Sequence, residues 1–294
     1  MFRVSRLFAT ALIGAGLVAG GIPGNAAAAS GKTIRIGWTA WSDAEAITRI
    51  TKQILENRMH EKVKLQLLDI ALQYNGVARG DIDMMLMAWL PTTHADYWAK
   101  VKDKVDDLGV LYRGASLGWV VPDYVPKSEL GSIADLKKSA VRDKLDGKIQ
   151  GIDPGAGLMR LSKKAIKDYG LSGYDLVSSS GAGMTAALKR AIIRKDWIVV
   201  TGWRPHWMFG AFKLRYLKDP KGTLGGKEQI HAVARKGFAK DDPKVAAFVS
   251  RIDMPLGLLE KVMYEGEKGS YKKAAAHFIA THEKMVDYWV TGKK

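Results

Sequence analysis

Short strand-like runs alternate with amphipathic, helix-like stretches along most of this 294-residue chain. The run at 33–40 (TIRIGWTA) precedes a stretch in which Ile47, Ile50 and Ile54 share one helical face. Ser42, followed by Glu45 three residues later, fits a capping box at the start of that helix. Alternation of this kind predicts an α/β fold, in which helices cover a largely parallel sheet.

The same alternation continues through the second half of the chain, where the length allows two lobes. Two stretches, near residues 112–120 and 225–238, read as extended and are candidate crossings between the lobes. We expect residues 30–116 and 225–294 to form the first lobe and residues 117–224 to form the second.

The first 29 residues read as a secretory signal peptide. Arg3 and Arg6 precede an apolar stretch, and small residues near Ala28 and Ala29 offer a cleavage site. No later run reaches the roughly 18–20 apolar residues of a membrane span. We expect cleavage near Ala28 or Ala29 and an exported, periplasmic protein.

Charge and cysteine content exclude several classes of function. The chain has no cysteine, so thiol catalysis and thiolate metal sites are excluded. The formal net charge is +16, but the lysines are scattered and no RNA-binding or zinc-knuckle motif is present. A solvated basic surface is the favoured interpretation, the alternative being weak attraction to anionic lipids or an acidic docking partner, and no nucleic-acid partner is predicted.

Unusual residues stand where predicted strands end. Trp41 follows the strand at 33–40, Trp89 follows a buried run at 81–88, and Trp203 follows WIVVTG. A fourth junction, DPGAG at 153–157, lies between a strand and a helix. Ligands of open α/β sheets bind at the carboxyl ends of the strands, so a cleft between two lobes would bring these four junctions face to face.

These residue types suit a zwitterion. Several indole faces around one point attract a quaternary ammonium and bury its methyl groups. Glycines at a helix start expose free amides that favour an anion, and His94 could add a hydrogen bond or a charge. Taken singly, each feature has a plainer explanation as core packing, a tight turn or a capping histidine.

The chain resembles the substrate-binding proteins of glycine betaine/choline ABC importers. The resemblance runs from about residue 33 to 290 and rests on AWLPTTHADYW (88–98), GIDPGAGLM (151–159) and GWRPHWMF (202–209). It implies a two-lobed periplasmic-binding-protein fold, type II-like, with the ligand in the interlobe cleft. It also implies a prism formed by Trp41, Trp89 and Trp203 around the trimethylammonium group. The backbone amides of Gly157 and Leu158, together with His94, would then hold the carboxylate.

Three further residues are secondary candidates. Asp43 resembles an aspartate that assists the cation in choline-type relatives, although PGAGLM favours a ligand with a carboxylate. Trp119 lies where some relatives place an additional cage aromatic, with hinge or core packing as the alternative. We expect His206 to brace Trp203 from behind.

The resemblance implies capture of glycine betaine or a related betaine for delivery to an ABC permease and ATPase. A choline- or carnitine-specific binding protein and a ligand-loaded sensor module are the alternatives. The sequence contains no nucleophile elbow, no dinucleotide-binding glycine fingerprint and no cluster of histidine and aspartate residues with metal-ligand spacing. It therefore offers no motif that would indicate an enzyme. We therefore predict no cofactor, no metal and no catalytic residue, and expect a monomer.

Overall fold

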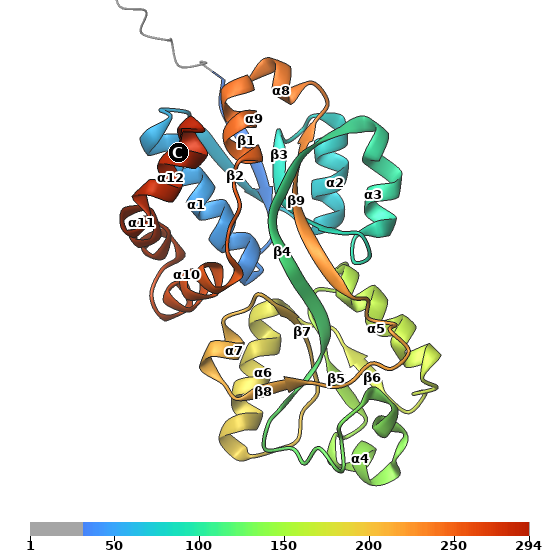
Figure 1. Ribbon diagram of the computed structural model, residues 1–294. Coiled ribbons are helices and arrows are strands. Elements are labelled where there is room, and N and C mark those ends of the chain that lie inside the picture. Colours follow the sequence, from blue (N-terminus) through green and yellow to red (C-terminus); the bar gives the residue numbers. More distant parts are fainter. Residues whose placement is uncertain (1–31, 294) are drawn as a thin grey trace, which may run out of the picture.

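The computed structural model describes residues 32–293, so the predicted signal peptide lies outside the described residues. Figure 1 shows two bodies, here called the upper and lower lobes, that are joined by two long strands. One nine-stranded sheet runs through both lobes in the order β2-β1-β3-β9-β4-β7-β5-β6, with β8 paired to β4. This is an α/β arrangement, as the alternating pattern predicts.

The upper lobe is built on three parallel strands, of which β3 is buried at all seven positions. A continuous apolar strand of this kind is expected where helices cover both faces of a sheet. The strands are β1 (Ile34–Trp38), β2 (Val63–Leu67) and β3 (Met84–Leu90). The helices are α1 (Ser42–Arg58), α2 (Ile70–Arg79), α3 (Ala95–Val101), α8 (Phe238–Asp241), α9 (Pro243–Ser250), α10 (Leu256–Lys268), α11 (Tyr271–Thr281) and α12 (Glu283–Thr291).

The lower lobe contains the middle third of the chain. Its strands are β5 (Lys148–Gln150), β6 (Asp175–Val177), β7 (Val200–Arg204) and β8 (Leu214–Tyr216). Its helices are α4 (Ser139–Lys144), α5 (Gly157–Asp168), α6 (Gly181–Arg194) and α7 (Met208–Ala211).

Strands β4 (Val105–Pro122) and β9 (Lys227–Arg235) connect the lobes. They pair antiparallel from Val105 to Ser116 of β4, where β4 changes partner and begins to pair with β7. The C-terminal helices then pack back against α1 in the upper lobe, as expected from the sequence. The predicted lobe boundaries at 116/117 and 224/225 stay predictions.

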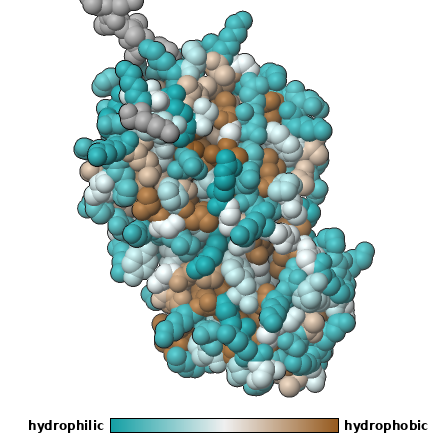
Figure 2. Space-filling model, in the orientation of Figure 1, coloured by the Kyte–Doolittle hydropathy of each residue, from teal (hydrophilic) through white to brown (hydrophobic). Residues whose placement is uncertain are grey.

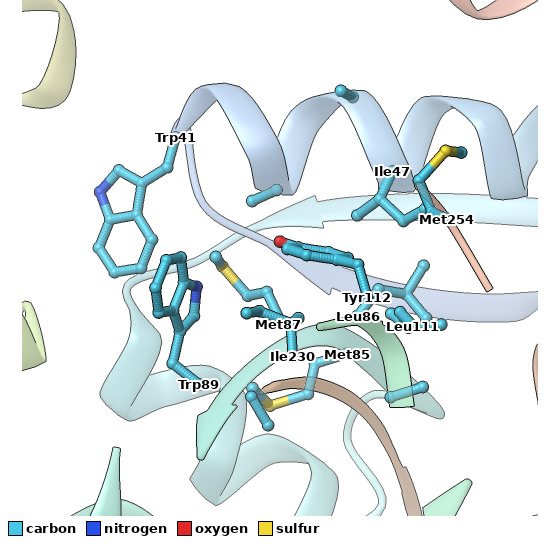
Figure 3. Packing of buried hydrophobic residues seen from close by; sticks show 14 of the residues in the cluster. Trp41, Ile47, Met85, Leu86, Met87, Trp89, Leu111, Tyr112, Ile230 and Met254 are labelled. Atoms are coloured by element: carbon cyan, nitrogen blue, oxygen red, sulfur yellow. The ribbon is translucent and has the colours of Figure 1, made fainter. Parts of the chain in front are cut away.

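Two apolar clusters form the core. The larger one fills the upper lobe and continues into the lower lobe at α6 and β7, and the smaller one lies in the lower lobe around Trp119 and Val121. Figure 3 shows Trp41 and Trp89 side by side at one end of the residues drawn, with Met87 and then Tyr112 next to them. The two rings are thus held by the packed interior of the upper lobe.

The surface is predominantly hydrophilic on the face shown in Figure 2, where hydrophobic residues show between polar ones. Among residues 32–293, no helix has both the length and the apolar character that a membrane crossing needs.

Three local expectations were wrong. Strands β3 and β7 end at Leu90 and Arg204, two residues later than predicted, because Trp89 pairs with Ile230 and Trp203 with Leu117. Trp89 and Trp203 are therefore the penultimate residues of their strands. The predicted capping box is absent at the start of α1, where Trp41 is the N-cap and makes no side-chain capping bond.

Candidate ligand-binding site

A small cavity lies between the lobes. All six residues predicted to bind the ligand line this cavity, although they come from both lobes and from distant parts of the chain. The lining consists of Trp41, Trp89, Thr93, His94, Leu117, Ile152, Ala156, Gly157, Leu158 and Trp203.

Three indole rings, here called the tryptophan cage, form much of the cavity wall. Trp41 is the N-cap of α1, Trp89 lies in β3 and Trp203 lies in β7. Their exposed fractions are only 7%, 3% and 3%, so the rings are shielded from bulk water. Desolvated indole faces attract an organic cation more strongly than exposed ones.

His94 supplies a neutral hydrogen-bond donor at the cavity wall. Its Nδ1 accepts the backbone N–H of Trp89 at 3.1 Å and lies 3.3 Å from the hydroxyl of Tyr74. Burial, helped by the charge of Arg160, lowers the pKa of His94 to about 3, so the ring is neutral near pH 7. Because Nδ1 accepts a hydrogen bond, the proton of the neutral ring resides on Nε2, which can donate to an anion.

The N-terminus of α5 also lines the cavity. The first backbone N–H groups of a helix have no intrahelical acceptor, and those of Gly157 and Leu158 are in this position. Such amides, at the positive end of the helix dipole, bind anions. Gly157 approaches the other lobe so closely that an added β-carbon would lie 2.1 Å from the carbonyl oxygen of Thr93.

Polar contacts hold the lobes together around the cavity. The Arg160 guanidinium donates to the carbonyl oxygens of Thr92 and Thr93 at 3.1 and 3.2 Å and pairs with Asp96 at 3.1 Å. The Tyr97 hydroxyl donates to the carbonyl oxygen of Gly155 at 2.7 Å. The structure therefore has its lobes closed over the cavity.

The three secondary candidates are not in the cavity lining. Asp43 is fully buried behind Trp203, whose Nε1 donates to its Oδ1 at 3.0 Å. His206 packs edge-on against Trp203, with ring centroids 4.5 Å apart, where it can brace that ring. Trp119 is fully buried in the lower core and donates to the hydroxyl of Ser162 at 2.9 Å, an environment that favours core packing over ligand contact.

Sequence reasoning missed several residues that shape the site. Glu228 is buried and accepts the backbone N–H groups of Thr92 and Thr93, which fixes the turn before His94. Asp153 accepts the indole N–H of Trp41 at 2.8 Å. No local sequence pattern distinguishes Glu228 from other glutamates. Asp153 is the first residue of the DPGAG motif, so its carboxylate was a signal that could have identified it.

The arrangement can hold a small zwitterion. The cavity lining combines three indole rings with the potential donors of His94, Gly157 and Leu158. Within the part of the chain that the structure describes, no group of histidine and acidic residues is placed to hold a metal ion.

Two α/β lobes closed over a small buried cavity define a substrate-binding protein. Residues 32–281 match the family described as the substrate-binding domain of the ABC-type glycine betaine transport system, and the chain belongs to this family. The predicted fold class and the resemblance seen in the sequence are both confirmed.

Individual relatives agree with this assignment. The glycine betaine/carnitine transport binding protein of Listeria monocytogenes is 35% identical over 186 residues, which span 62% of this chain and 58% of that protein. The lactococcal OpuAC structure, closed and complexed with glycine betaine, is 37% identical with a TM-score of 0.82, covering 88% of this chain and 100% of that one. A choline-binding protein of an ABC transporter, in complex with choline, is 27% identical with a TM-score of 0.81, covering 88% and 92%.

Proposed function

We propose that this protein captures glycine betaine, or a closely related betaine, and delivers it to the permease and ATPase of an ABC importer. The observation that carries the proposal is the composition of one cavity. The tryptophan cage would face a trimethylammonium group, while His94 and the α5 amides would face a carboxylate. The liganded lactococcal relative supports the same choice.

The assignment of residues follows from this geometry. Trp41, Trp89 and Trp203 would contact the cation, and His94 with the amides of Gly157 and Leu158 would bind the anion. The lobes, with the predicted boundaries, would close by hinge motion at the β4 and β9 connections. A ligand that touches both lobes favours the closed state through its differential affinity.

The cellular setting belongs to the same proposal. The protein would act as a periplasmic monomer after removal of its signal peptide, without cofactor and without enzymatic activity. The related binding proteins support a role in transport.

Choline is the competing ligand. It shares the trimethylammonium group but ends in a hydroxyl, and the choline-bound relative has a similar fold. For choline, the charge-assisted hydrogen bonds to a carboxylate would be lost.

Calorimetric titration of the mature protein with glycine betaine, proline betaine, carnitine, dimethylsulfoniopropionate and choline tests the function. We expect a betaine to bind most tightly and at one site per chain. Tightest binding by choline would move the assignment to the choline alternative. Absence of binding by all five compounds would overturn it.

A further inference from the structure

Two of the three cage tryptophans are held by carboxylates of the opposite lobe. Trp41 belongs to the upper lobe, and its Nε1 donates to Oδ2 of Asp153 in the lower lobe at 2.8 Å. Trp203 belongs to the lower lobe, and its Nε1 donates to Oδ1 of Asp43 in the upper lobe at 3.0 Å. The two contacts are reciprocal across the cleft, so both depend on the lobes being closed.

The acceptor for Trp203 is itself held in place. The second oxygen of Asp43 accepts the hydroxyl of Tyr112 at 2.8 Å, and Asp43 has no exposed surface. His206 packs edge-on against the same indole. Asp153 is half-buried and belongs to the turn that leads to α5, so its bond to Trp41 also places the cage beside the α5 amides.

These bonds also favour the electrostatics of a cation site. An indole has a negative face and a positive edge, to which its N–H belongs. When the N–H points at a carboxylate, the edge is occupied and the ring face remains available to a cation. Each carboxylate also lies near the cage, and at Asp43 burial raises the pKa and so opposes the negative charge.

We propose that Asp43 and Asp153 are positioning residues that orient Trp203 and Trp41 from the opposite lobe, so that the cage is complete only in the closed protein. The two aspartates thereby slow ligand release. This inference rests on the proposed function, because it concerns the cage that would bind the trimethylammonium group.

A double-mutant cycle tests the pair formed by Asp153 and Trp41. Glycine betaine binding is measured by calorimetry, and its release by stopped-flow fluorescence, in wild type, Asp153→Ala, Trp41→Phe and the double variant. Trp41→Phe keeps an aromatic ring but lacks the N–H. We expect Asp153→Ala to weaken binding about tenfold in wild type, mainly through faster release, because a charge-assisted hydrogen bond is lost. In the Trp41→Phe background, Asp153→Ala should weaken glycine betaine binding by less than about twofold.

Two matched variants distinguish an effect of Asp153 on the orientation of the indole ring from an effect of its negative charge alone. Asp153→Asn keeps an oxygen acceptor and should retain more affinity than Asp153→Ala. Asp69 lines the same rim of the cleft as Asp153 and is exposed, so Asp69→Ala removes a comparable charge without disturbing an indole bond. Its effect should stay within about twofold, since exposed charges are screened.

The second pair repeats the cycle with Asp43→Ala and Trp203→Phe, and Asp43→Asn is the conservative variant because Asp43 is fully buried. Thermal melts identify any variant that does not fold. If Asp153→Ala lowers the affinity for glycine betaine equally in wild type and in Trp41→Phe, or lowers it in neither, the inference is overturned and the proposed function is left intact. Failure of the wild-type protein to bind any trimethylammonium compound would overturn both.

Discussion

Gly157 and Thr93 lie in different lobes, yet a β-carbon on Gly157 would stand 2.1 Å from the Thr93 carbonyl oxygen and 2.8 Å from its Cγ2. Carbon and oxygen atoms that are not bonded cannot approach so closely, and the clashing oxygen is backbone. The absence of a side chain at residue 157 therefore allows the lobes to close while the α5 amides face the cavity.

We predict that Gly157→Ala weakens glycine betaine binding at least tenfold, or by ~1.4 kcal/mol, because the added methyl group keeps the lobes apart. Gly155→Ala is the matched control, since a β-carbon at Gly155 meets no atom within 4 Å. Calorimetry gives the affinities, and small-angle scattering with ligand should show a less compact particle for Gly157→Ala only. Equal affinities of the two variants would refute this explanation.

The cage tryptophans should each contribute strongly to affinity. Replacing Trp41, Trp89 or Trp203 by alanine removes an aromatic face and buried area, and we expect each change to weaken binding at least tenfold. Phenylalanine at the same positions should retain more affinity than alanine. Trp289→Phe, in the core of the upper lobe, should lower the melting temperature without changing the affinity of the folded protein. Unchanged affinity in two of the three alanine variants would disprove the cage assignment.

Arg160 joins the lobes directly and should slow ligand release. Arg160→Met keeps the apolar stem but removes the bonds to Thr92, Thr93 and Asp96. Because the side chain is 40% exposed, we expect only about three- to tenfold faster dissociation in a stopped-flow experiment. Lys164→Met, one turn further along α5, removes a positive charge that pairs within the helix and should have little effect. Identical release rates in the two variants would count against an interlobe role for Arg160.

Acid should destabilise the protein partly through His206. Burial lowers the pKa of His206 to about 3, whereas an unfolded histidine titrates near ~6.5. Between these values the unfolded state binds one more proton, so stability falls as the pH is lowered, by up to ~1.4 kcal/mol per pH unit. His206 Nδ1 accepts the N–H of Met208 at 3.1 Å, and asparagine can replace that acceptor. Melting temperatures of His206→Asn should therefore fall less steeply than those of wild type between pH 6.5 and 4, and parallel curves would contradict this assignment.

The sequence was sufficient to predict the fold class and six of the ten residues that line the cavity. Apolar runs indicated the strands, and the junctions containing Trp41, Trp89, Trp203 and DPGAG fall at strand ends, where ligands of α/β proteins bind. The family resemblance then assigned roles to His94, Gly157 and Leu158. Local pattern was enough here because each motif is continuous in the chain.

Contacts between distant residues could not be predicted in this way. The Trp41–Asp153 and Thr93–Glu228 bonds join residues 112 and 135 positions apart, and no local pattern encodes such a pairing. The two strands that end later than expected do so because antiparallel neighbours from the other half of the chain extend the ladder. The Ser42–Glu45 spacing suggested a capping box, but it occurs just as readily when serine is the first helical residue, as it is in α1.

Paired titrations with glycine betaine and choline, on wild type and on His94→Ala, test most directly whether the cavity recognises a zwitterion. The donors of His94, Gly157 and Leu158 match a carboxylate, and each charge-assisted bond contributes ~1.5–3 kcal/mol. We predict that wild type binds glycine betaine at least tenfold more tightly than choline, and that His94→Ala narrows this gap by weakening betaine binding more than choline binding. Choline bound as tightly as betaine by wild type, with equal losses for both ligands in His94→Ala, would contradict the account.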